Sequence, residues 1–186
     1  MTNPEKLHAI ERKMLDDAAR KIAPLDLGRF RRPLIEGNRG LAWRVAWYLV
    51  NALLFQGAIL GLIPSSMKAM ILRAFGAKVG SGFVCKPRVT IKYPWFLEIG
   101  DNVWLGEMVW IDDLCRVTIG SNVCISQGTY IFTGNHDWTD PTFPFFCEPV
   151  VIGDGVWVTA FQRIGPGRRI EPHTLVADNG ASDTST

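Results

Sequence analysis

The fold is decided by three consecutive units of six residues, Ile99-Gly-Asp-Asn-Val-Trp, Leu105-Gly-Glu-Met-Val-Trp and Ile111-Asp-Asp-Leu-Cys-Arg. After a slip of two residues the pattern restarts as Ile119-Gly-Ser-Asn-Val-Cys and Ile125-Ser-Gln-Gly-Thr-Tyr, and Ile131 opens the next unit. Each unit begins with a branched aliphatic residue, which is often followed by glycine. A repeat of this length is typical of a parallel β-helix, in which neighbouring units stack.

The same spacing continues on both sides of this stretch. Upstream, Val79, Cys85 and Ile91 are six residues apart, and downstream the pattern returns at Ile152, Val158, Ile164, Ile170 and Val176. No unit can bury its own aliphatic side chain, so stacked neighbours must supply the core. The sequence therefore predicts one β-helix over residues 77–178 with an inserted loop over 132–151. Loops on a rigid scaffold often carry function, so this loop is the first candidate.

Length and composition exclude several classes of protein. The 186 residues suffice for one domain with an appended segment, and 47% hydrophobic with 20% charged residues excludes general disorder. A net charge of +2 argues against a nucleic-acid partner. The four cysteines have no CxxC spacing, which favours reduced thiols in a cytoplasmic protein, and residues 1–22 lack the apolar core of a signal peptide.

Residues 1–76 are expected to form an N-terminal helical segment. Glu5–Ile22 fits a short polar helix, and Pro24 and Pro33 mark a linker. Ser65–Phe75 fits a second short helix that closes at Gly76. The most apolar stretch, residues 41–63, lies between them and predicts one longer helix.

Three settings are open for the helix over 41–63. In the first setting, it packs on the β-helix or on a partner subunit. In the second, it belongs to a segment, 29–63, that makes peripheral contact with the inner face of the membrane. In the second setting, upstream basic residues meet anionic lipid: Arg29, Arg31, Arg32, Arg39 and Arg44. A true span needs about 20 apolar residues, but Arg44, Asn51 and Gln56 are costly at membrane depth. The expected localisation is cytoplasmic, with membrane association left open.

Several motifs resemble those of the hexapeptide-repeat acyltransferases, a family with a left-handed parallel β-helix. The similarity is greatest to colanic-acid-biosynthesis-type and nodulation-type sugar O-acetyltransferases. It covers roughly residues 29–176 and rests on Phe75-Gly-Ala-Lys-Val-Gly, Tyr93-Pro-Trp, Ile125-Ser-Gln, Thr133-Gly-Asn-His-Asp-Trp, Pro149-Val-Val-Ile-Gly-Asp-Gly-Val-Trp and Pro166-Gly. The resemblance implies acetyl transfer from acetyl-CoA to a saccharide hydroxyl, such as that of an exopolysaccharide precursor. It also implies a homotrimer with active sites between neighbouring subunits. No metal is expected, because no histidine lies near enough in sequence to the cysteines to complete a zinc motif.

By this resemblance His136 is the catalytic residue, a general base that takes the proton of the acceptor hydroxyl. The residues alone agree, because an alcohol attacks a thioester poorly until its proton is removed, and neutral imidazole titrates near working pH. The other two histidines are less well situated, since His8 lies in the polar leader and His173 near the end. Asn135 and Asp137 flank His136 and are expected to support it, Asp137 by orienting the ring or the loop.

The resemblance also suggests residues for the two substrates. Those expected to bind the acceptor are Asp112, Asp113 and Trp138, although the aspartates could equally be turn residues. Those expected along the pantetheine arm of acetyl-CoA are Trp157, Thr159, Ala160 and Gly165, although Trp157 could instead be an exterior aromatic of its coil.

The C-terminal coils depart from the family pattern, and a polar tail follows over 179–186. Gln162 and Arg168 stand four residues after an aliphatic, where the repeat has a small, inward-facing residue. Since a buried unpaired guanidinium is prohibitively costly, these coils are expected to be distorted, frayed or shifted in register. A non-catalytic β-helix scaffold or partner protein therefore stays open as an alternative. A metal enzyme of the γ-carbonic-anhydrase kind needs three clustered histidines, which this sequence cannot bring together.

Overall fold

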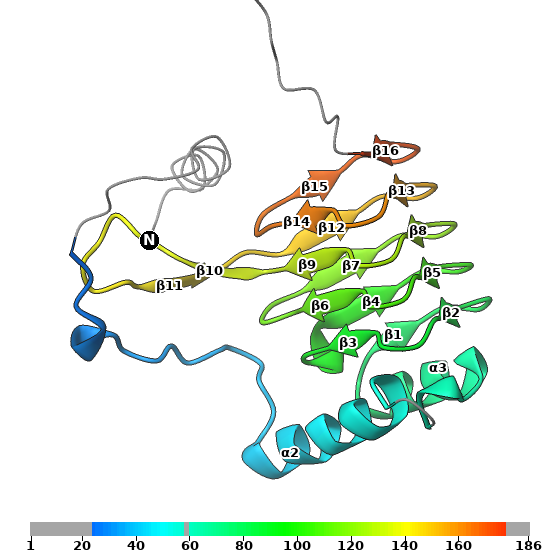
Figure 1. Ribbon diagram of the computed structural model, residues 1–186, viewed down its shortest axis with the longest axis horizontal. Coiled ribbons are helices and arrows are strands. Elements are labelled where there is room, and N and C mark those ends of the chain that lie inside the picture. The colour runs from blue at the N-terminus through cyan, green and yellow to red at the C-terminus, as the bar shows by residue number, and fades with distance from the viewer. Residues whose placement is uncertain (1–23, 58–59, 178–186) are drawn as a thin grey trace, which may run out of the picture.

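Three parallel β-sheets form the walls of a prism, around which the chain winds in successive coils (Figure 1). The computed structural model describes residues 24–57 and 60–177, so the predicted helix Glu5–Ile22 and the tail 179–186 lie outside the described residues. Sheet A contains β1 (Lys78–Val79), β4 (Leu97–Ile99), β7 (Val117–Ile119), β12 (Val150–Ile152) and β15 (Arg169–Ile170). Sheet B contains β2 (Val84–Cys85), β5 (Trp104–Leu105), β8 (Cys124–Ile125), β13 (Trp157–Val158) and β16 (Leu175–Val176). Sheet C contains β3 (Thr90–Ile91), β6 (Trp110–Asp112), β9 (Tyr130–Phe132) and β14 (Arg163–Ile164). The predicted parallel β-helix is confirmed.

The aliphatic residues of the repeat stack above one another inside the prism. In sheet A, Val79 pairs with Ile99, Ile99 with Ile119, and Ile119 with Ile152. Each of these four side chains is at most 9% exposed. Burial of one such side chain contributes about 1.5–3 kcal/mol, so the aliphatic ladders hold the coils together.

Two of the three corners of the prism turn through one residue with a left-handed backbone. Between sheets A and B these residues are, coil by coil, Gly82, Asn102, Asn122, Gly155 and His173. Between sheets B and C they are Arg88, Met108, Gly128 and Phe161. Glycine and asparagine adopt this conformation at low cost, which explains their recurrence in the repeat. His173 is thus a corner residue of the last described coil.

Helices cover the first coil of the prism at its base (Figure 1). The helical elements are η1 (Leu27–Arg29), α2 (Leu41–Val50), the π-helix η2 (Asn51–Phe55), η3 (Leu60–Leu62), α3 (Ser65–Ala74) and η4 (Pro94–Phe96). Trp47, Phe55 and Leu72 are fully buried in the same core as the aliphatic ladders. The indole nitrogen of Trp47 donates to the carbonyl O of Ile91 at 2.9 Å, which fixes α2 to the first coil. The predicted second helix is confirmed as α3.

The apolar stretch 41–63 is not one helix, contrary to the prediction. The helical run ends at Phe55, whose carbonyl O accepts the N–H of Arg88 at 2.9 Å. That bond uses the acceptor that a continuing helix needs for its own next turn. The chain then bends at Gln56 and Gly57, where a Cβ on Gly57 would clash with the carbonyl O of Leu53. Within residues 24–57 and 60–177, no helix has the length and hydropathy needed to cross a membrane.

The C-terminal coils keep the register of the earlier ones, so the expected distortion is wrong. β14 pairs with β9 and β15 with β12, and Ile164 and Ile170 are buried. Gln162 is half-buried and its side-chain amide donates to the carbonyl O of Ala160 at 3.2 Å. Arg168 is exposed, because it precedes β15, the last strand of sheet A, where no further described coil covers it. The arginine therefore gives no reason to prefer a non-catalytic scaffold.

Candidate functional site

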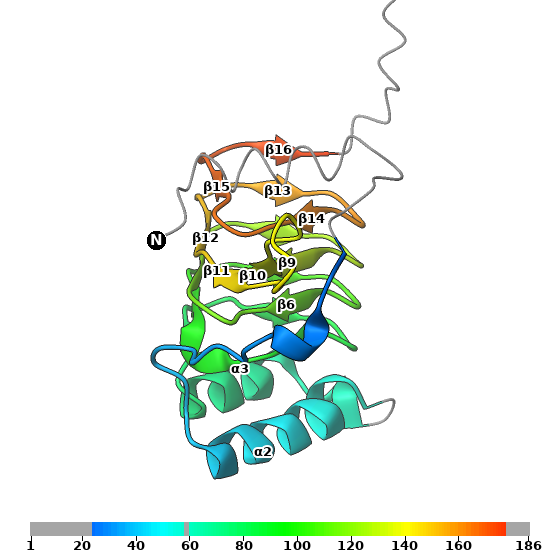
Figure 2. The same cartoon turned by 90° about the vertical axis from the view of Figure 1, so that its left-hand side faces the viewer.

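The inserted loop leaves the prism at the corner between sheets C and A. In the first two coils this corner contains Tyr93 with η4, and then Asp113 with Leu114. One full coil spans 20 residues, as the spacing between Asn102 and Asn122 shows, which is two more than three units of six. The two extra residues are the slip in the repeat, and they lie at the corner between sheets C and A. In the third coil the corner expands into an antiparallel hairpin, β10 (Gly134–His136) and β11 (Phe145–Cys147), which projects sideways (Figures 1 and 2).

Thr133 fixes this hairpin to the prism. Its side chain is fully buried, and its Oγ1 accepts the N–H groups of Leu114 and Cys115 at 2.8 and 3.1 Å. The same hydroxyl donates to the carbonyl O of Asp112 at 3.2 Å. The thiol of Cys147, one of four free cysteines, donates to it at 3.5 Å. A buried hydroxyl with these partners sets the direction in which the hairpin leaves the prism.

The hairpin holds the ring of His136 in one orientation. Its Nδ1 lies 2.9 Å from the carbonyl O of Phe143. Because a carbonyl oxygen only accepts, the neutral ring must carry its proton on Nδ1, which leaves the lone pair on Nε2. The ring stacks on that of Phe143, with centroids 4.1 Å and planes 6° apart, and meets the rings of Phe145 and Phe30 at 5.5 and 5.4 Å. The half-exposed imidazole is thus a positioned proton acceptor.

The neighbours of His136 shape the loop. The side-chain oxygen of Asn135 accepts the N–H of His136 at 2.8 Å. The carboxylate of Asp137 accepts the N–H and the hydroxyl of Thr139 at 2.9 and 2.6 Å, so Asp137 orders the turn and not the ring. Trp138 is half-buried, and its indole nitrogen is buried with no partner among the described residues.

The two aspartates predicted for the acceptor have different surroundings. Asp113 is fully buried, its carboxylate accepts the N–H of Tyr93 at 2.7 Å, and burial raises the pKa of this carboxyl well above its ordinary value. Asp112 keeps 16% of its side chain exposed, pairs with Lys92 at 2.7 Å and accepts the hydroxyl of Tyr130 at 3.2 Å. Only Asp112 therefore has surface to offer a ligand, and Asp113 is a turn residue.

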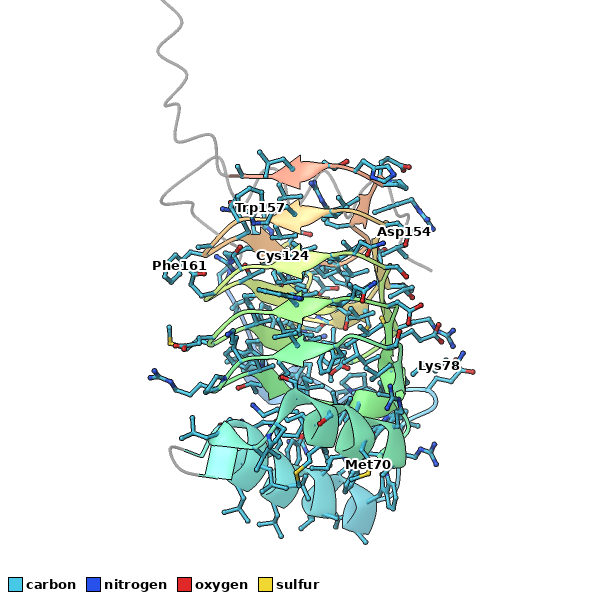
Figure 3. All side chains as sticks on the ribbon, turned by 90° about the vertical axis from the view of Figure 1, so that its right-hand side faces the viewer. Met70, Lys78, Cys124, Asp154, Trp157 and Phe161 are labelled. Carbon is cyan, nitrogen blue, oxygen red and sulfur yellow. The ribbon has the colours of Figure 1, made fainter. Side chains whose placement is uncertain are left out.

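An open groove of about 460 Å³ lies on the outer face of sheet B. Its lining includes Trp104, Glu107, Met108, Cys124, Ser126 and Gln127. Trp104, Cys124 and Trp157 are paired across β5, β8 and β13, and Figure 3 shows Cys124 and Trp157 on this face. The indole nitrogen of Trp157 donates to the hydroxyl of Ser126 at 3.0 Å, so Trp157 stands at the edge of the groove.

The other residues predicted for acetyl-CoA follow Trp157 along the chain. Thr159 and Ala160 are half-buried after β13, and the hydroxyl of Thr159 donates to the carbonyl O of Val176 at 3.0 Å. Gly165 comes directly after β14. Within one chain, sheet B with its groove and the hairpin with His136 lie on opposite sides of the prism (Figure 1). Within one chain the groove and His136 are therefore separated by the prism.

Sequence reasoning missed the aromatic residues around His136. Phe143 and Phe145 belong to the run Phe143-Pro-Phe-Phe, which was the available signal for them. Phe30 comes from the strap, residues 24–40, which runs past the hairpin on its way to α2 (Figure 2). The N–H of Asp26 in the strap donates to the carbonyl O of Pro141 at 2.9 Å. No local pattern links the strap to the loop.

Comparison with known proteins identifies the family. A protein of Escherichia coli K12 named as the colanic acid biosynthesis acetyltransferase WcaF is 38% identical over 130 residues, which cover 70% of each chain. The galactoside O-acetyltransferase of the same organism is 28% identical over 109 residues, 57% of this chain and 54% of that protein. The chain belongs to the hexapeptide-repeat acetyltransferase family.

A solved structure agrees at the level of the fold. The hexapeptide-repeat acetyltransferase of Vibrio cholerae in complex with acetyl coenzyme A has a TM-score of 0.66 and 23% identity, and the match covers 74% of each chain. No protein-family model matches this sequence.

Proposed function

We propose that this hexapeptide-repeat acetyltransferase transfers an acetyl group from acetyl-CoA to a hydroxyl of a saccharide, with His136 as general base. The names of its relatives support an acetyl donor and a sugar acceptor. The observation that carries the proposal is the 2.9 Å contact between His136 Nδ1 and the carbonyl O of Phe143, since it fixes the ring and leaves a lone pair on Nε2. A base held in this way contributes about 10²–10⁴-fold to a reaction.

In the proposed reaction the acceptor hydroxyl donates a hydrogen bond to Nε2 of His136. Its oxygen attacks the thioester carbonyl while its proton passes to Nε2, so a C–O bond forms in a tetrahedral intermediate. Collapse of the intermediate breaks the C–S bond, and the leaving thiolate takes the proton back from the imidazolium. The products are an O-acetyl ester and the free thiol of CoA. The carbonyl of Phe143 keeps its bond to Nδ1–H throughout and stabilises the transient positive charge.

The residues near the groove and near His136 suit these substrates. The groove on sheet B offers tryptophan surface, Trp104 and Trp157, with 54% of each residue exposed, for the pantetheine arm of acetyl-CoA. Thr159, Ala160 and Gly165 extend this proposed binding surface along the next coil. On the acceptor side, the partly exposed carboxylate of Asp112 supplies a hydrogen-bond acceptor for a hydroxyl-rich ligand, and the half-buried Trp138 supplies aromatic surface.

A neighbouring subunit must complete the site in this proposal. His136 and the groove of its own chain are separated by the prism, so the base serves the groove of an adjacent copy. In a closed homotrimer, one kind of heterologous contact occurs three times, and each contact brings the hairpin of one copy to the groove of the next.

The test compares two histidine variants with the same substitution. CoA release from acetyl-CoA is measured with a panel of mono- and oligosaccharides for the wild type, His136→Asn and His173→Asn. We expect kcat/KM to fall by about 10²–10⁴-fold in His136→Asn. His173→Asn should retain wild-type activity, because His173 is a corner residue whose backbone conformation asparagine tolerates. Equal rates in His136→Asn and the wild type would contradict the assignment.

A further inference from the structure

The helical base of the molecule, formed by α2, η2 and α3, has an apolar outer face. In α2 and η2 the exposed side chains recur at helical spacing, and they include Leu41, Val45, Tyr48, Leu49, Ala52 and Leu53. A surface helix normally turns its polar side chains to solvent. Here the pattern is reversed, since Asn51 is only 3% exposed whereas Leu49 is 60% exposed.

The neighbouring elements extend this face. Met67 and Met70 of α3 are 44% and 60% exposed, and Leu62 is 68% exposed. Figures 1 and 2 show α2 and α3 side by side beneath the prism, and Figure 3 shows Met70 at this end of the molecule. A large exposed apolar patch that continues across two helices marks an interaction site.

The segment that forms the face carries charge of one sign. Residues 37–97 contain no aspartate or glutamate, and their basic residues are Arg39, Arg44, Lys68, Arg73, Lys78, Lys86, Arg88 and Lys92. Lys78, Arg88 and Lys92 pair with acidic residues of later coils. Arg39, Arg73 and Lys86 are exposed next to the helices: Arg39 before α2, Arg73 in the last turn of α3, and Lys86 directly after β2, where it also lines the groove on sheet B. The guanidinium of Arg73 also donates to the carbonyl O atoms of Val79 and Gly80 at 2.9 and 2.8 Å.

We propose that the helical base docks on a membrane surface that carries anionic headgroups. The outer stripe of α2 and η2 then enters the boundary between headgroups and acyl chains, while Arg39, Arg73 and Lys86 meet lipid phosphates. α2 has 10 residues and η2, which continues it, has 5; together they are shorter than the roughly 20 residues that a span requires, so the helical run lies along the surface. Trp43 and Tyr48, 41% and 44% exposed, are of the aromatic types enriched at this depth.

A second copy of the chain fits this face less well than lipid does. A two-fold pairing through the base would bring the same face of both copies together, so the patch that carries Arg39, Arg73 and Lys86 would face an equally basic patch of the other copy. Within residues 37–97 no carboxylate is available to offset that repulsion. Anionic lipid attracts the same charges, and the apolar stripe is buried in either case.

Membrane docking of the helical base is separate from acetyl transfer, so it is tested without acetyl-CoA. The full chain is sedimented with vesicles of phosphatidylcholine, with or without phosphatidylglycerol, as wild type and as the double variant Leu49→Gln, Leu53→Gln. The control is Leu175→Gln, because Leu175 is 59% exposed, as Leu49 is at 60%, but lies in β16 at the opposite end of the prism. We expect the wild type to bind the anionic vesicles, the double variant to bind at least about tenfold more weakly, and the control to bind like the wild type.

A second pair of variants tests the charge. Arg39→Gln with Lys86→Gln should weaken binding to anionic vesicles by several-fold, whereas Arg168→Gln, in the last coil, should not. Added salt should weaken the wild type in the same way. Failure of the wild type to bind anionic vesicles, equal binding to both vesicle types, or equal loss in the Leu175→Gln control would overturn the proposal. So would a doubled mass by light scattering without vesicles that the Leu49→Gln, Leu53→Gln variant abolishes, because the face would then belong to a second copy.

Discussion

The prism and the hairpin that leaves it are held together by different forces. In the prism, strands pair along the stack and their aliphatic side chains are almost fully buried, so each coil repeats the contacts of the one below. In the hairpin, all six strand residues keep partial exposure. Its conformation depends on single directional contacts, such as the bonds of Thr133 and the contact between His136 and Phe143. The scaffold therefore gains its stability from repetition, whereas the proposed base is oriented by contacts that occur once.

The largest effect should come from the prism. Ile111 is fully buried in β6 and is paired with Ile91 on one side and Ile131 on the other. Ile111→Ala should lower the free energy of unfolding by about 2–5 kcal/mol, as measured by urea denaturation. The folded variant should keep most of its acetyltransferase activity below its melting transition. A small stability loss with a large activity loss would show that scaffold and site are not separable in this way.

The corner between prism and hairpin should respond to pH. Burial raises the pKa of Asp113 in the folded state, so the folded protein holds this proton at pH values where the unfolded chain has lost it. The stabilisation that this bound proton gives to the folded state is fully present below the unfolded pKa. It is lost as pH rises toward the folded pKa, and the free energy of unfolding falls by up to about 1.4 kcal/mol per pH unit.

Asp113→Asn removes that titration while keeping an oxygen for the N–H of Tyr93. The stability of the wild type should therefore fall relative to that of the variant as pH rises above the unfolded carboxyl pKa of about 3.9. Thermal melts across this pH range measure the difference. Parallel pH profiles for the two proteins would contradict the role of Asp113 as a buried, protonated turn residue.

The smallest effect should come from the ring beneath His136. Phe143→Leu keeps the carbonyl that bonds Nδ1 but removes the stacked ring, a contact worth about 0.5–1.5 kcal/mol. We expect kcat to fall by up to about tenfold with the melting temperature nearly unchanged. Phe146→Leu, in β11, is the matched control and should leave kcat unchanged. Equal kcat values in Phe143→Leu and the wild type would show that the carbonyl alone orients the imidazole.

The sequence predicted the prism well because each coil repeats the same six-residue spacing. The spacing that starts at Ile99 identifies the buried face of each strand, and the break after Ile131 locates the hairpin. The end of α2–η2 at Phe55 was not predictable, because it depends on a bond to Arg88 in another element. Arg168 was misjudged for a similar reason: its exposure follows from its position before the last strand of a sheet, which the repeat does not encode.

The site was only partly predictable. His136 stands out as a histidine in the single interruption of the repeat, and the structure gives its ring a fixed orientation. The aromatic contacts with Phe30 join segments more than 100 positions apart without any shared pattern. The separation of His136 from the groove of its own chain also appears only in three dimensions.

If the hairpin of one subunit serves the groove of its neighbour, mixed oligomers of two inactive variants should regain activity. His136→Asn removes the base, and Cys124→Trp fills the groove that Cys124 lines. Each variant alone should be inactive. When the two are unfolded and refolded together in equal amounts, about one quarter of the sites should pair an intact hairpin with an intact groove and regain activity. A mixture no more active than the separate variants would contradict the account.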